Sequence, residues 1–511
     1  MINVPNSPSE IHPSLSFFKS WRPNQKETVE KIINSDKRFI ILNAPTGTGK
    51  SIIAITSALL SSEKTYITTY TKQLQDQYLR EFPEIVKTIK GRNNYPCLLL
   101  PGLTAENCIE LIKQRCPVKD QCPYNRAKQE VIESKIAIFN NAYYLSALNY
   151  TDHFPHANFV VIDEAHLIEH SLMNFIECKF TKSQMDKLYL PYPNPKDDII
   201  EYLKDLLDKT ILHIETIKEE LKYAIDTEDQ DNIQDLTKSL KKYQTIERKA
   251  KFLLSNIDNT WVIDYTPLHI TFKPVFVHPY KEYIFNHGDK FLLMSATVSK
   301  SIIDTLDLPP NECEYIELPS PFPVENRPLI FMPRVNMSYR TQEKALPILM
   351  RLINQVLDRH EDEKGIIHTS SNKLAKYIYE HCSHKDRTLL AIGDQKQQAL
   401  ETHRKSKNTV LISPSLDTGI DFKYDDGRFQ IIVNLPFPSL NDKQVKKRAS
   451  MDKNWYVNQM ANKLVQMYGR TNRAEDDYSV TYIFDERLLY YLKKYPTHFP
   501  KWFIEAVKVV K

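Results

Sequence analysis

The sequence predicts an α/β protein with two doubly wound units, each a parallel sheet covered by helices on both faces. Three observations predict this fold class. Short apolar runs alternate with helical patterns in both halves of the chain, as parallel sheets require. The chain has 511 residues, which is too long for one hydrophobic core. A phosphate-binding pattern directly follows the apolar run 39–43.

Composition and charge are those of a globular protein, and the sequence shows the signals of neither a membrane-spanning nor a secreted protein. Apolar residues make up 41% of the chain and charged residues 26%. The net charge is only +4, so a basic surface for nucleic acid must be local. The chain shows neither a run of eighteen apolar residues nor a signal-peptide pattern at its start. We therefore expect a cytoplasmic protein with reduced thiols and no membrane span.

The loop after the first predicted strand has the composition of a phosphate-binding loop. Its backbone N–H groups and the N-terminus of the following helix can bind phosphate. Lys50 can reach the β- and γ-phosphates, and the Ser51 hydroxyl can bind Mg²⁺. The strict pattern begins with glycine, where this chain has Ala44, so an ordinary strand-to-helix turn is the alternative. The nucleotide-binding residues predicted here are Ala44, Pro45, Thr46, Gly47, Thr48, Gly49, Lys50 and Ser51.

Polar residues near this loop are candidates for other ligand contacts. Gln25 lies upstream and could read the adenine edge, or could lie in a solvated loop. The alternating run 65–70 predicts a second strand, and a helix follows it. At this junction Thr69, Thr71 and Gln75 could contact a phosphodiester backbone. The alternative for Thr71 is a simple helix cap.

Four of the seven cysteines fall within 26 residues, which suggests a metal site in a reducing compartment. Zinc sites usually contain cysteine pairs two to four residues apart. Here the intervals are ten, seven and five residues, which fits a [4Fe–4S] cluster better than zinc. Spacing alone leaves iron–sulfur, zinc and unmetallated thiols open. The four candidates are Cys97, Cys108, Cys116 and Cys122.

Two carboxylates follow the apolar run 159–162, which predicts a buried strand. The C-terminal end of such a strand faces the ligand crevice of an α/β sheet. Asp163 can hold the Mg²⁺ that Ser51 binds, and Glu164 can orient and deprotonate an attacking water. An isolated Asp-Glu pair is usually a solvated strand end, but its place after a phosphate-binding loop favours catalysis.

Residues 196–258 have a different pattern from the rest of the chain. Apolar residues recur at spacings of three and four in two stretches, and residues 226–229 separate them. This pattern predicts a helical hairpin inserted into the α/β fold.

The second half of the chain again alternates strands and helices. Arg470 and Arg473 lie one helical turn apart, so both can point the same way and act as arginine fingers. As a lone motif, two such arginines are usually surface residues. The predicted strands are 365–368, 409–412, 430–433 and 480–483, and the predicted helices are 342–358, 371–382 and 454–468.

In this order, these segments resemble the superfamily 2 helicases of the XPD/DinG type. The resemblance places Gly419 and Asp421 at the nucleotide and Gln466 with the two arginines in catalysis. The matching segments are residues 44–51 (motif I), 69–77 (Ia), 163–166 (II, Asp-Glu-Ala-His), 295–297 (III), 366–371 (IV), 419–421 (V) and 466–473 (VI).

In this family the segment similar to residues 90–97 opens an iron–sulfur domain. The resemblance therefore implies a [4Fe–4S] cluster on the four cysteines, with Lys90 and Arg92 beside the nucleic acid. The cysteine spacing after Cys97 is shorter than is typical of the family. The resemblance implies a RecA-like domain 1 in residues 1–88, 136–190 and 261–310, an iron–sulfur domain in 89–135, a helical arch in 191–260 and a RecA-like domain 2 in 311–511.

The resemblance implies an ATP- and Mg²⁺-dependent DNA helicase that moves 5′→3′ on single-stranded DNA and unwinds duplex or forked DNA. We expect a monomer, with no membrane contact. One alternative is an RNA or RNA–DNA hybrid helicase, which would differ in its contacts to the 2′-hydroxyl. Another is a nucleic-acid-binding scaffold with a degenerate ATPase fold, against which the intact Lys50, Glu164 and Arg470 argue.

Overall fold

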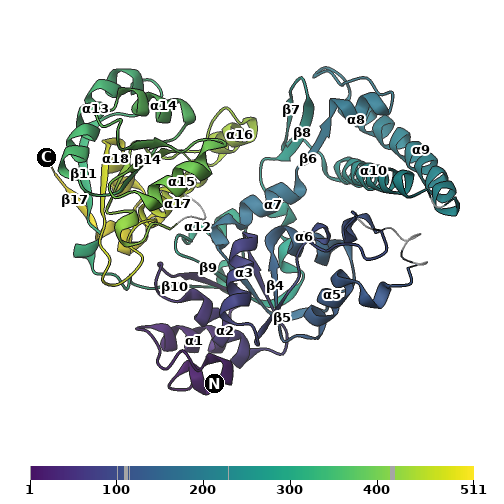
Figure 1. Cartoon of the computed structure of the whole chain (residues 1–511), viewed down its shortest axis with the longest axis horizontal. Coiled ribbons are helices and arrows are strands. Elements are labelled where there is room, and N and C mark those ends of the chain that lie inside the picture. The colour runs from purple at the N-terminus through teal and green to yellow at the C-terminus, as the bar shows by residue number, and fades with distance from the viewer. Residues whose placement is uncertain are drawn as a thin grey trace.

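A computed structural model describes residues 2–100, 102–108, 113, 116–227, 229–414 and 421–510. Two parallel sheets with flanking helices form the body of the molecule, and a long helical hairpin projects from one of them (Figure 1). We call the unit around the first sheet the first domain and the unit around the second sheet the second domain. In the described part of the chain, neither the hairpin nor any other helix combines the length and apolar character that a membrane crossing needs.

The first sheet has 7 strands in the order β10-β1-β9-β5-β2-β4-β3, and every neighbouring pair is parallel. Burial along the whole of β1 fits a sheet that is covered on both faces. Register aligns the C-terminal ends of the strands, so that Asn43 lies beside Ser295. The strands are β1 (Phe39–Asn43), β2 (Thr65–Thr69), β3 (Val86–Thr88), β4 (Ile136–Asn140), β5 (Ala157–Asp163), β9 (Gly288–Ser295) and β10 (Cys313–Glu317).

Helices cover both faces of this sheet and bury two separate apolar clusters. Alternate residues of β1 point to opposite clusters: Ile40 and Leu42 to one, Phe39 and Ile41 to the other. The first cluster lies under α1 (Gln25–Asn34), α2 (Lys50–Ser61) and α3 (Lys72–Glu81). The second lies under α5 (Pro123–Glu133), α6 (Asn141–Tyr150), α7 (Ile168–Ile176), α11 (Glu282–Phe285) and α12 (Ser301–Thr305).

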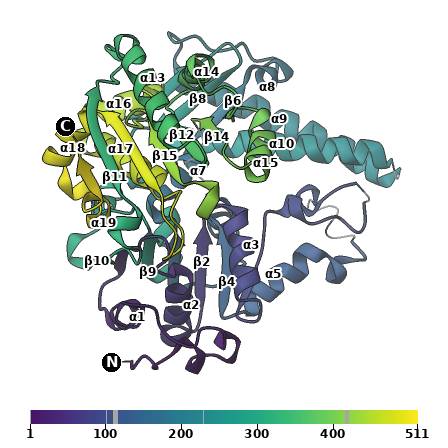
Figure 2. The ribbon, with the colours of Figure 1, turned by 60° about the vertical axis from the view of Figure 1, so that its left-hand side comes forward.

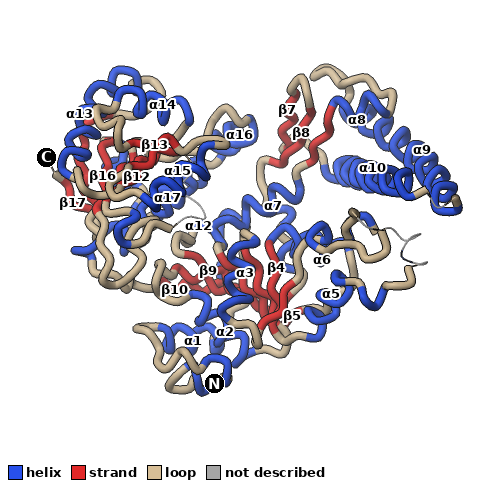
Figure 3. Tube along the Cα trace, in the orientation of Figure 1, coloured by secondary structure: helices blue, strands red, loops and turns tan. Residues whose placement is uncertain are grey.

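The second sheet also has 7 parallel strands, in the order β13-β14-β12-β15-β16-β11-β17. Figure 3 draws its strands in red among the blue helices of this domain. Two doubly wound parallel sheets confirm the predicted fold class. The strands are β11 (Leu329–Val335), β12 (Gly365–His368), β13 (Thr388–Leu390), β14 (Val410–Ser413), β15 (Phe429–Ile432), β16 (Val480–Asp485) and β17 (Val507–Val509). The helices are α13 (Gln342–Arg359), α14 (Asn372–His381), α15 (Gln395–Lys405), α16 (Lys443–Met451), α17 (Lys453–Tyr468), α18 (Arg487–Lys494) and α19 (Lys501–Ile504).

The helical hairpin consists of α9 (Ile199–Asp226) and α10 (Gln230–Asn256), as the apolar spacing predicts. Buried residues of α9 such as Leu206 and Ile217 share a cluster with Leu240 and Ile246 of α10. A small antiparallel sheet at the hairpin base was not predicted. It is built from β6 (Cys178–Thr181), β8 (His269–Pro274) and β7 (Trp261–Tyr265), with α8 (Lys182–Lys187) leading into the hairpin.

Two of the expected domain boundaries need correction. Residues 261–274 belong to the sheet at the hairpin base, and β10 pairs with β1 in the first sheet. The boundary at residue 310 is thus too early, because a strand that completes the sheet edge follows it. The insertion 89–135 contains α5 and short helical turns, η3 (Arg92–Asn94), η4 (Ala105–Asn107) and η5 (Lys119–Gln121). It lies beneath the hairpin, where η4 contacts α10 (Figure 2).

Candidate functional site

The phosphate-binding loop joins β1 to α2 at the C-terminal edge of the first sheet. Gly47 and Gly49 have positive φ angles of 87° and 77°, which side chains rarely allow. A Cβ on Gly49 would lie only 2.3 Å from Nε2 of Gln25, so this glycine also makes room for a neighbour. The Lys50 ammonium donates to the Ala44 carbonyl at 3.2 Å and thus folds back over the loop. The loop therefore has the shape and charge that a polyphosphate needs.

Gln25 supports this loop from behind, and both ends of its side-chain amide form hydrogen bonds there. It is buried, and its Nε2 donates to the Thr48 carbonyl at 2.7 Å. Its Oε1 accepts from the Arg22 backbone N–H at 2.9 Å, and the Arg22 guanidinium donates to the Gly47 carbonyl at 2.6 Å. In this structure the amide that could have read adenine instead holds the loop in place.

Asp163 and Glu164 lie at the end of β5, beside the phosphate-binding loop. The Tyr78 hydroxyl donates to Asp163 Oδ2 at 3.0 Å and also lies in hydrogen-bond contact with the Ser51 hydroxyl. The two expected Mg²⁺ ligands, Ser51 and Asp163, are therefore joined through one tyrosine. Sequence reasoning missed Tyr78, because a tyrosine at helical spacing in α3 indicates only a core position.

Burial and charge set the protonation of this group. Burial, followed by the Glu164 charge, raises the pKa of Asp163 to about 6, and Lys50 opposes the shift. Burial would also raise the pKa of Glu164, but His166, Lys50 and Arg470 outweigh it and hold that pKa below its ordinary value. Burial lowers the pKa of His166 to about 4. Near neutral pH, Glu164 is therefore an ionised base beside a neutral imidazole.

A chain of hydrogen bonds runs from Glu164 to the second domain. The Ser295 hydroxyl donates to Glu164 Oε2 at 3.3 Å and contacts His166 Nδ1 at 2.6 Å. The other ring nitrogen of His166 meets the side-chain amide of Gln466, near the end of α17. Glu164 is thus linked to a residue of the other domain through two side chains.

The two predicted arginines also reach this site from the second domain. Arg473 donates to the Thr46 hydroxyl of the phosphate-binding loop at 2.7 Å and pairs with Asp421 at 2.5 Å. Arg470 pairs with the same Asp421 at 3.3 Å, and its charge helps to lower the pKa of Glu164. Of the five residues that the sequence predicts here, four come together at this site: Asp421, Gln466, Arg470 and Arg473. The fifth, Gly419, lies outside the described residues.

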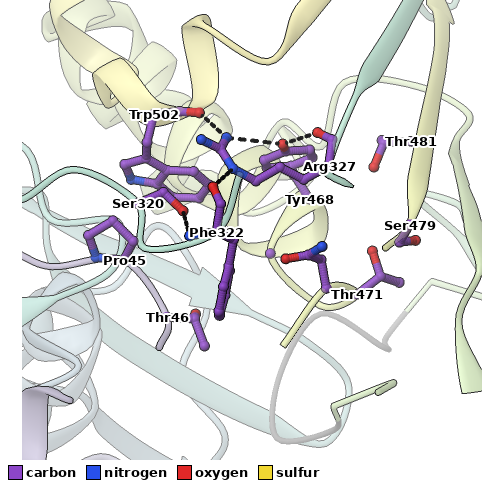
Figure 4. A pocket seen from close by; sticks show the side chains of 12 residues that line it. Pro45, Thr46, Ser320, Phe322, Arg327, Tyr468, Thr471, Ser479, Thr481 and Trp502 are labelled. Atoms are coloured by element: carbon purple, nitrogen blue, oxygen red, sulfur yellow. Dashed lines mark hydrogen bonds between the residues drawn. The ribbon is translucent and has the colours of Figure 1, made fainter. Parts of the chain in front are cut away.

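The linker between the domains, residues 318–328, adds an aromatic contact to the phosphate-binding loop (Figure 4). The Phe322 ring lies against Gly47, where an added Cβ would come within 2.4 Å of it. Arg327 donates to the Phe322 carbonyl at 3.0 Å and to the Trp502 carbonyl at 2.5 Å. Phe322, Arg327 and Trp502 line a small pocket between the domains together with Pro45 and Thr46. Only the flanking prolines mark Phe322 in the sequence, and they do not indicate this contact.

A second contact holds α17 against the first domain. The partly buried carboxylate of Glu169 in α7 accepts from the Trp455 indole at 2.9 Å and from the Gln459 amide at 3.0 Å. The hydroxyl of Ser299 donates to Asn458 at 3.0 Å. Since α17 also carries Gln466, movement of the second domain moves this end of the site.

The four clustered cysteines are free, partly exposed thiols in the insertion. The pKa of Cys108 is raised first by burial and then by the charges of Cys97, Cys116 and Cys122, while Arg92 lowers it. The Leu100 backbone N–H donates to the sulfur of Cys97 at 3.4 Å. Among the described residues, no three His, Cys, Asp or Glu side chains already have the arrangement of a metal site. As a set of donors, four neighbouring thiols fit an iron–sulfur cluster.

The residues expected to contact a strand near motif Ia serve the fold instead. Thr69 and Gln75 are fully buried, and the Gln75 amide donates to the Ile89 carbonyl at 2.8 Å. The Thr71 hydroxyl accepts from the Leu74 N–H and caps α3. The prediction of direct contacts by Thr69 and Gln75 is therefore wrong for this conformation, because their polar atoms face the core.

Basic side chains gather instead where the insertion meets the hairpin. Arg92 lies over the Tyr124 ring at 5.0 Å and is close enough to Lys128 and to Lys241 of α10 to lower their pKa values, after burial. Lys90, by contrast, is paired with Asp76 at 2.5 Å. Arg92, Lys128 and Lys241 therefore form a local group of basic side chains, which we call the basic surface.

Comparison with known proteins places these features in context. Residues 353–506 match the family described as helicase C-terminal domain, and residues 18–188 match the type III restriction enzyme res subunit. The probable ATP-dependent helicase MJ0942 of Methanocaldococcus jannaschii is 22% identical over 92% of this chain and 92% of its own. The ATP-dependent DNA helicase YoaA of Escherichia coli is 22% identical, over 94% of this chain and 93% of its own.

Solved structures agree on the fold. An XPD helicase structure has a TM-score of 0.62 at 16% identity and covers 95% of this chain and 98% of its own. The structure of S. tokodaii Xpd4 has a TM-score of 0.59 at 16% identity, with 96% and 100% covered. The two parallel-sheet domains are therefore RecA-like.

Proposed function

Because this chain is an ATP-dependent helicase of superfamily 2, of the XPD/DinG type, we propose that it moves along single-stranded DNA in the 5′→3′ direction and unwinds duplex or forked DNA. It acts as a monomer, and hydrolysis of ATP drives the movement. The DNA substrate follows from the YoaA relatives, which are DNA helicases by name. The direction follows from the family resemblance.

In this proposal each side chain of the cleft has one role. Lys50 binds the β- and γ-phosphates, and Ser51 and Asp163 would hold Mg²⁺, which would neutralise phosphate charge. Glu164, whose lowered pKa keeps it ionised at neutral pH, accepts a proton from the attacking water. Arg470 and Arg473 stabilise the charge that develops on the transferred phosphoryl group.

The observation that carries the proposal is the contact of Arg473 with Thr46 across the domain boundary. A nucleotide bound on the loop would lie beside this arginine, so its γ-phosphate would draw the domains together and its loss would release them. A strand held by both domains would then be moved with each cycle. Gln466 and the Glu169 contact with α17 would transmit the same movement.

The strand contacts in this proposal are sequence-independent. Arg92 and Lys241 form part of the basic surface between insertion and hairpin, which suits a phosphodiester backbone. Lys90 positions this segment through its pair with Asp76. Cys97, Cys108, Cys116 and Cys122 would hold one [4Fe–4S] cluster, which would supply a structural crosslink for the insertion.

Strand displacement with ATP tests the proposal on duplexes with a 5′ tail, a 3′ tail, a fork and an RNA–DNA hybrid. We expect displacement of the forked and 5′-tailed DNA duplexes, and hydrolysis stimulated by single-stranded DNA, since a bound strand favours the closed cleft. Displacement only of hybrids would identify an RNA–DNA helicase instead. Strand binding with equal ATP turnover in its presence and absence would contradict movement driven by ATP.

A further inference from the structure

A cavity of about 280 Å³ lies where the helical hairpin joins the first domain. We call it the hairpin-base cavity. Its walls come from α6, α7, β6, α10 and α11, and none of the residues of the nucleotide site lines it. The volume is near the lower end of the roughly 300–1,000 Å³ of small-molecule sites, which suits one heterocycle with its substituents.

Aromatic rings form one side of this cavity. Tyr150 and Phe175 lie 5.5 Å apart between centroids, and Phe175 meets Tyr283 edge-on at 5.3 Å. Tyr150 is 47% exposed, so part of its side chain remains open to a ligand. The Arg248 guanidinium lies 4.3 Å from the centre of the Tyr150 ring. Flat aromatic and guanidinium faces of this kind stack on nucleobases.

The charge of the wall favours an anion. Arg248 and Lys249 both line the cavity. Glu177 is the one carboxylate among the lining residues, and its charge is compensated by Lys273 at 3.3 Å. A ligand with an aromatic ring and a phosphate therefore matches both the aromatic rings and the basic side chains of the wall.

The cavity continues the basic surface that begins at the insertion. Lys241, which interacts with Arg92 and Cys108, precedes Arg248 by seven residues on α10. Seven residues are close to two helical turns, so both side chains lie on one face, about 10 Å apart along the axis. A strand that follows this face from the insertion would reach the hairpin-base cavity next.

We propose that the hairpin-base cavity is a subsite for one nucleotide of the bound strand, whose base stacks on Tyr150 and Phe175 while Arg248 and Lys249 bind its phosphate. This inference rests on the proposed movement along single-stranded DNA. The inference adds a site at which the protein binds a nucleobase of the strand, and not only its phosphodiester backbone. Stacking of this kind tolerates any base sequence, because every base has an aromatic face.

Photocrosslinking tests where the strand lies. The full-length protein is irradiated with oligothymidylates that carry one 4-thiothymidine at successive positions, and adducts are mapped by mass spectrometry. We expect one position to react with peptides that contain Tyr150, Phe175 or Tyr283. Adducts confined to other parts of the protein would overturn the proposal. Binding of thymidine monophosphate to the cavity without any strand adduct there would also overturn it.

An abasic site tests whether a base is what the cavity holds. Removing the base at the crosslinking position should weaken binding to the parent protein by about 5- to 100-fold. Tyr150→Ala should weaken binding to the intact strand by a similar factor and should respond little to the abasic site. Tyr150→Phe keeps the ring and should bind like the parent. Additive effects of the substitution and the abasic site would show that Tyr150 does not contact the base.

Matched variants separate this inference from the proposed function. Tyr223→Ala removes an exposed tyrosine elsewhere on the hairpin, and Arg351→Ala removes an exposed arginine of the second domain, as a control for Arg248→Ala. Both controls should bind and unwind like the parent. If the parent unwinds DNA but Tyr150→Ala and Arg248→Ala bind the strand like the controls, the subsite is wrong and the helicase function stands. If the parent does not unwind DNA, the proposed function fails first.

Discussion

The nucleotide cleft follows the strands β1 and β5, the cysteine insertion follows the edge strand β3, and the two regions are held in different ways. In the cleft, Lys50, Asp163 and Ser295 lie where strands buried along most or all of their length meet their following loops. In the insertion, the four cysteines lie in loops and short turns. In the described stretch 102–108, which contains Cys108, the buried apolar residues are Leu103 and Ala105.

This difference has a physical cause. A parallel sheet with an apolar cluster on each face positions the ends of its strands before any ligand arrives. A short segment cannot bury enough apolar surface to fix its own side chains, so a bound metal group would have to supply that order. A change of one residue in the cleft should therefore reduce ATP hydrolysis but leave the fold largely unchanged. The insertion should lose structure when one thiol is changed.

Lys50→Ala should have the largest effect on chemistry. It removes the one charge of the loop that reaches the phosphates, so ATP hydrolysis should be abolished while binding of single-stranded DNA persists. Steady-state ATPase and strand binding by fluorescence anisotropy measure both. Lys19→Ala, an exposed lysine of the same domain, is the control. Hydrolysis at the parental rate in Lys50→Ala would refute the assignment of the loop.

Glu164→Gln should slow hydrolysis by about 10²–10⁴-fold, because it removes the base but keeps its shape. ATP binding should persist, since the amide leaves Lys50 and the loop unchanged. Single-turnover hydrolysis and nucleotide binding check the two expectations separately. Glu63→Gln changes an exposed glutamate of the same domain and should have no effect. Normal turnover would move the catalytic base to another residue.

Cys108→Ser should reduce unwinding more than hydrolysis. Loss of one of the four thiolates should release the cluster and disorder the insertion, so that Arg92 loses its place beside the strand. Anaerobically purified protein is tested for iron, acid-labile sulfide, visible absorbance, ATPase and unwinding. Cys313→Ser changes a thiol of β10, outside the insertion, and should retain both iron and unwinding.

Two results would contradict this view of the insertion. Stoichiometric zinc without sulfide in the parent protein would exclude the cluster. Undiminished unwinding by Cys108→Ser without iron would show that the insertion holds its shape without a metal group, as the cleft does.

Tyr78→Phe should have the smallest of these effects. It removes the hydroxyl that joins Ser51 and Asp163, and loss of such an outer partner typically costs about 10- to 100-fold in metal affinity or activity. We expect a higher Mg²⁺ requirement for hydrolysis with an unchanged melting temperature. Tyr66→Phe removes another buried hydroxyl, which donates to the Pro155 carbonyl, and should leave the Mg²⁺ requirement unchanged. An equal shift in both variants would mean that Tyr78 only supports the fold.

Much of the fold could be predicted because its signals are local. Apolar runs such as 159–162 and the spacing in 196–258 depend on residues close together in the chain, and both elements are present. The sheet at the hairpin base escaped prediction because its strands, such as β6 and β8, are short and far apart in sequence. Thr69 and Gln75 were misassigned because their residue types do not show which way they face.

The sequence by itself determined the two doubly wound α/β units, the phosphate-binding loop and the order of the motifs, since each depends on short-range spacing of residue types. Only the tertiary structure decided that Gln25 supports the loop and that Tyr78 joins Ser51 to Asp163. It also decided that the pKa of Glu164 lies below its ordinary value despite burial, because the charges of His166, Lys50 and Arg470 outweigh the effect of burial. These properties come from burial and charge shared between residues up to several hundred positions apart, and such effects exist only once the chain has folded.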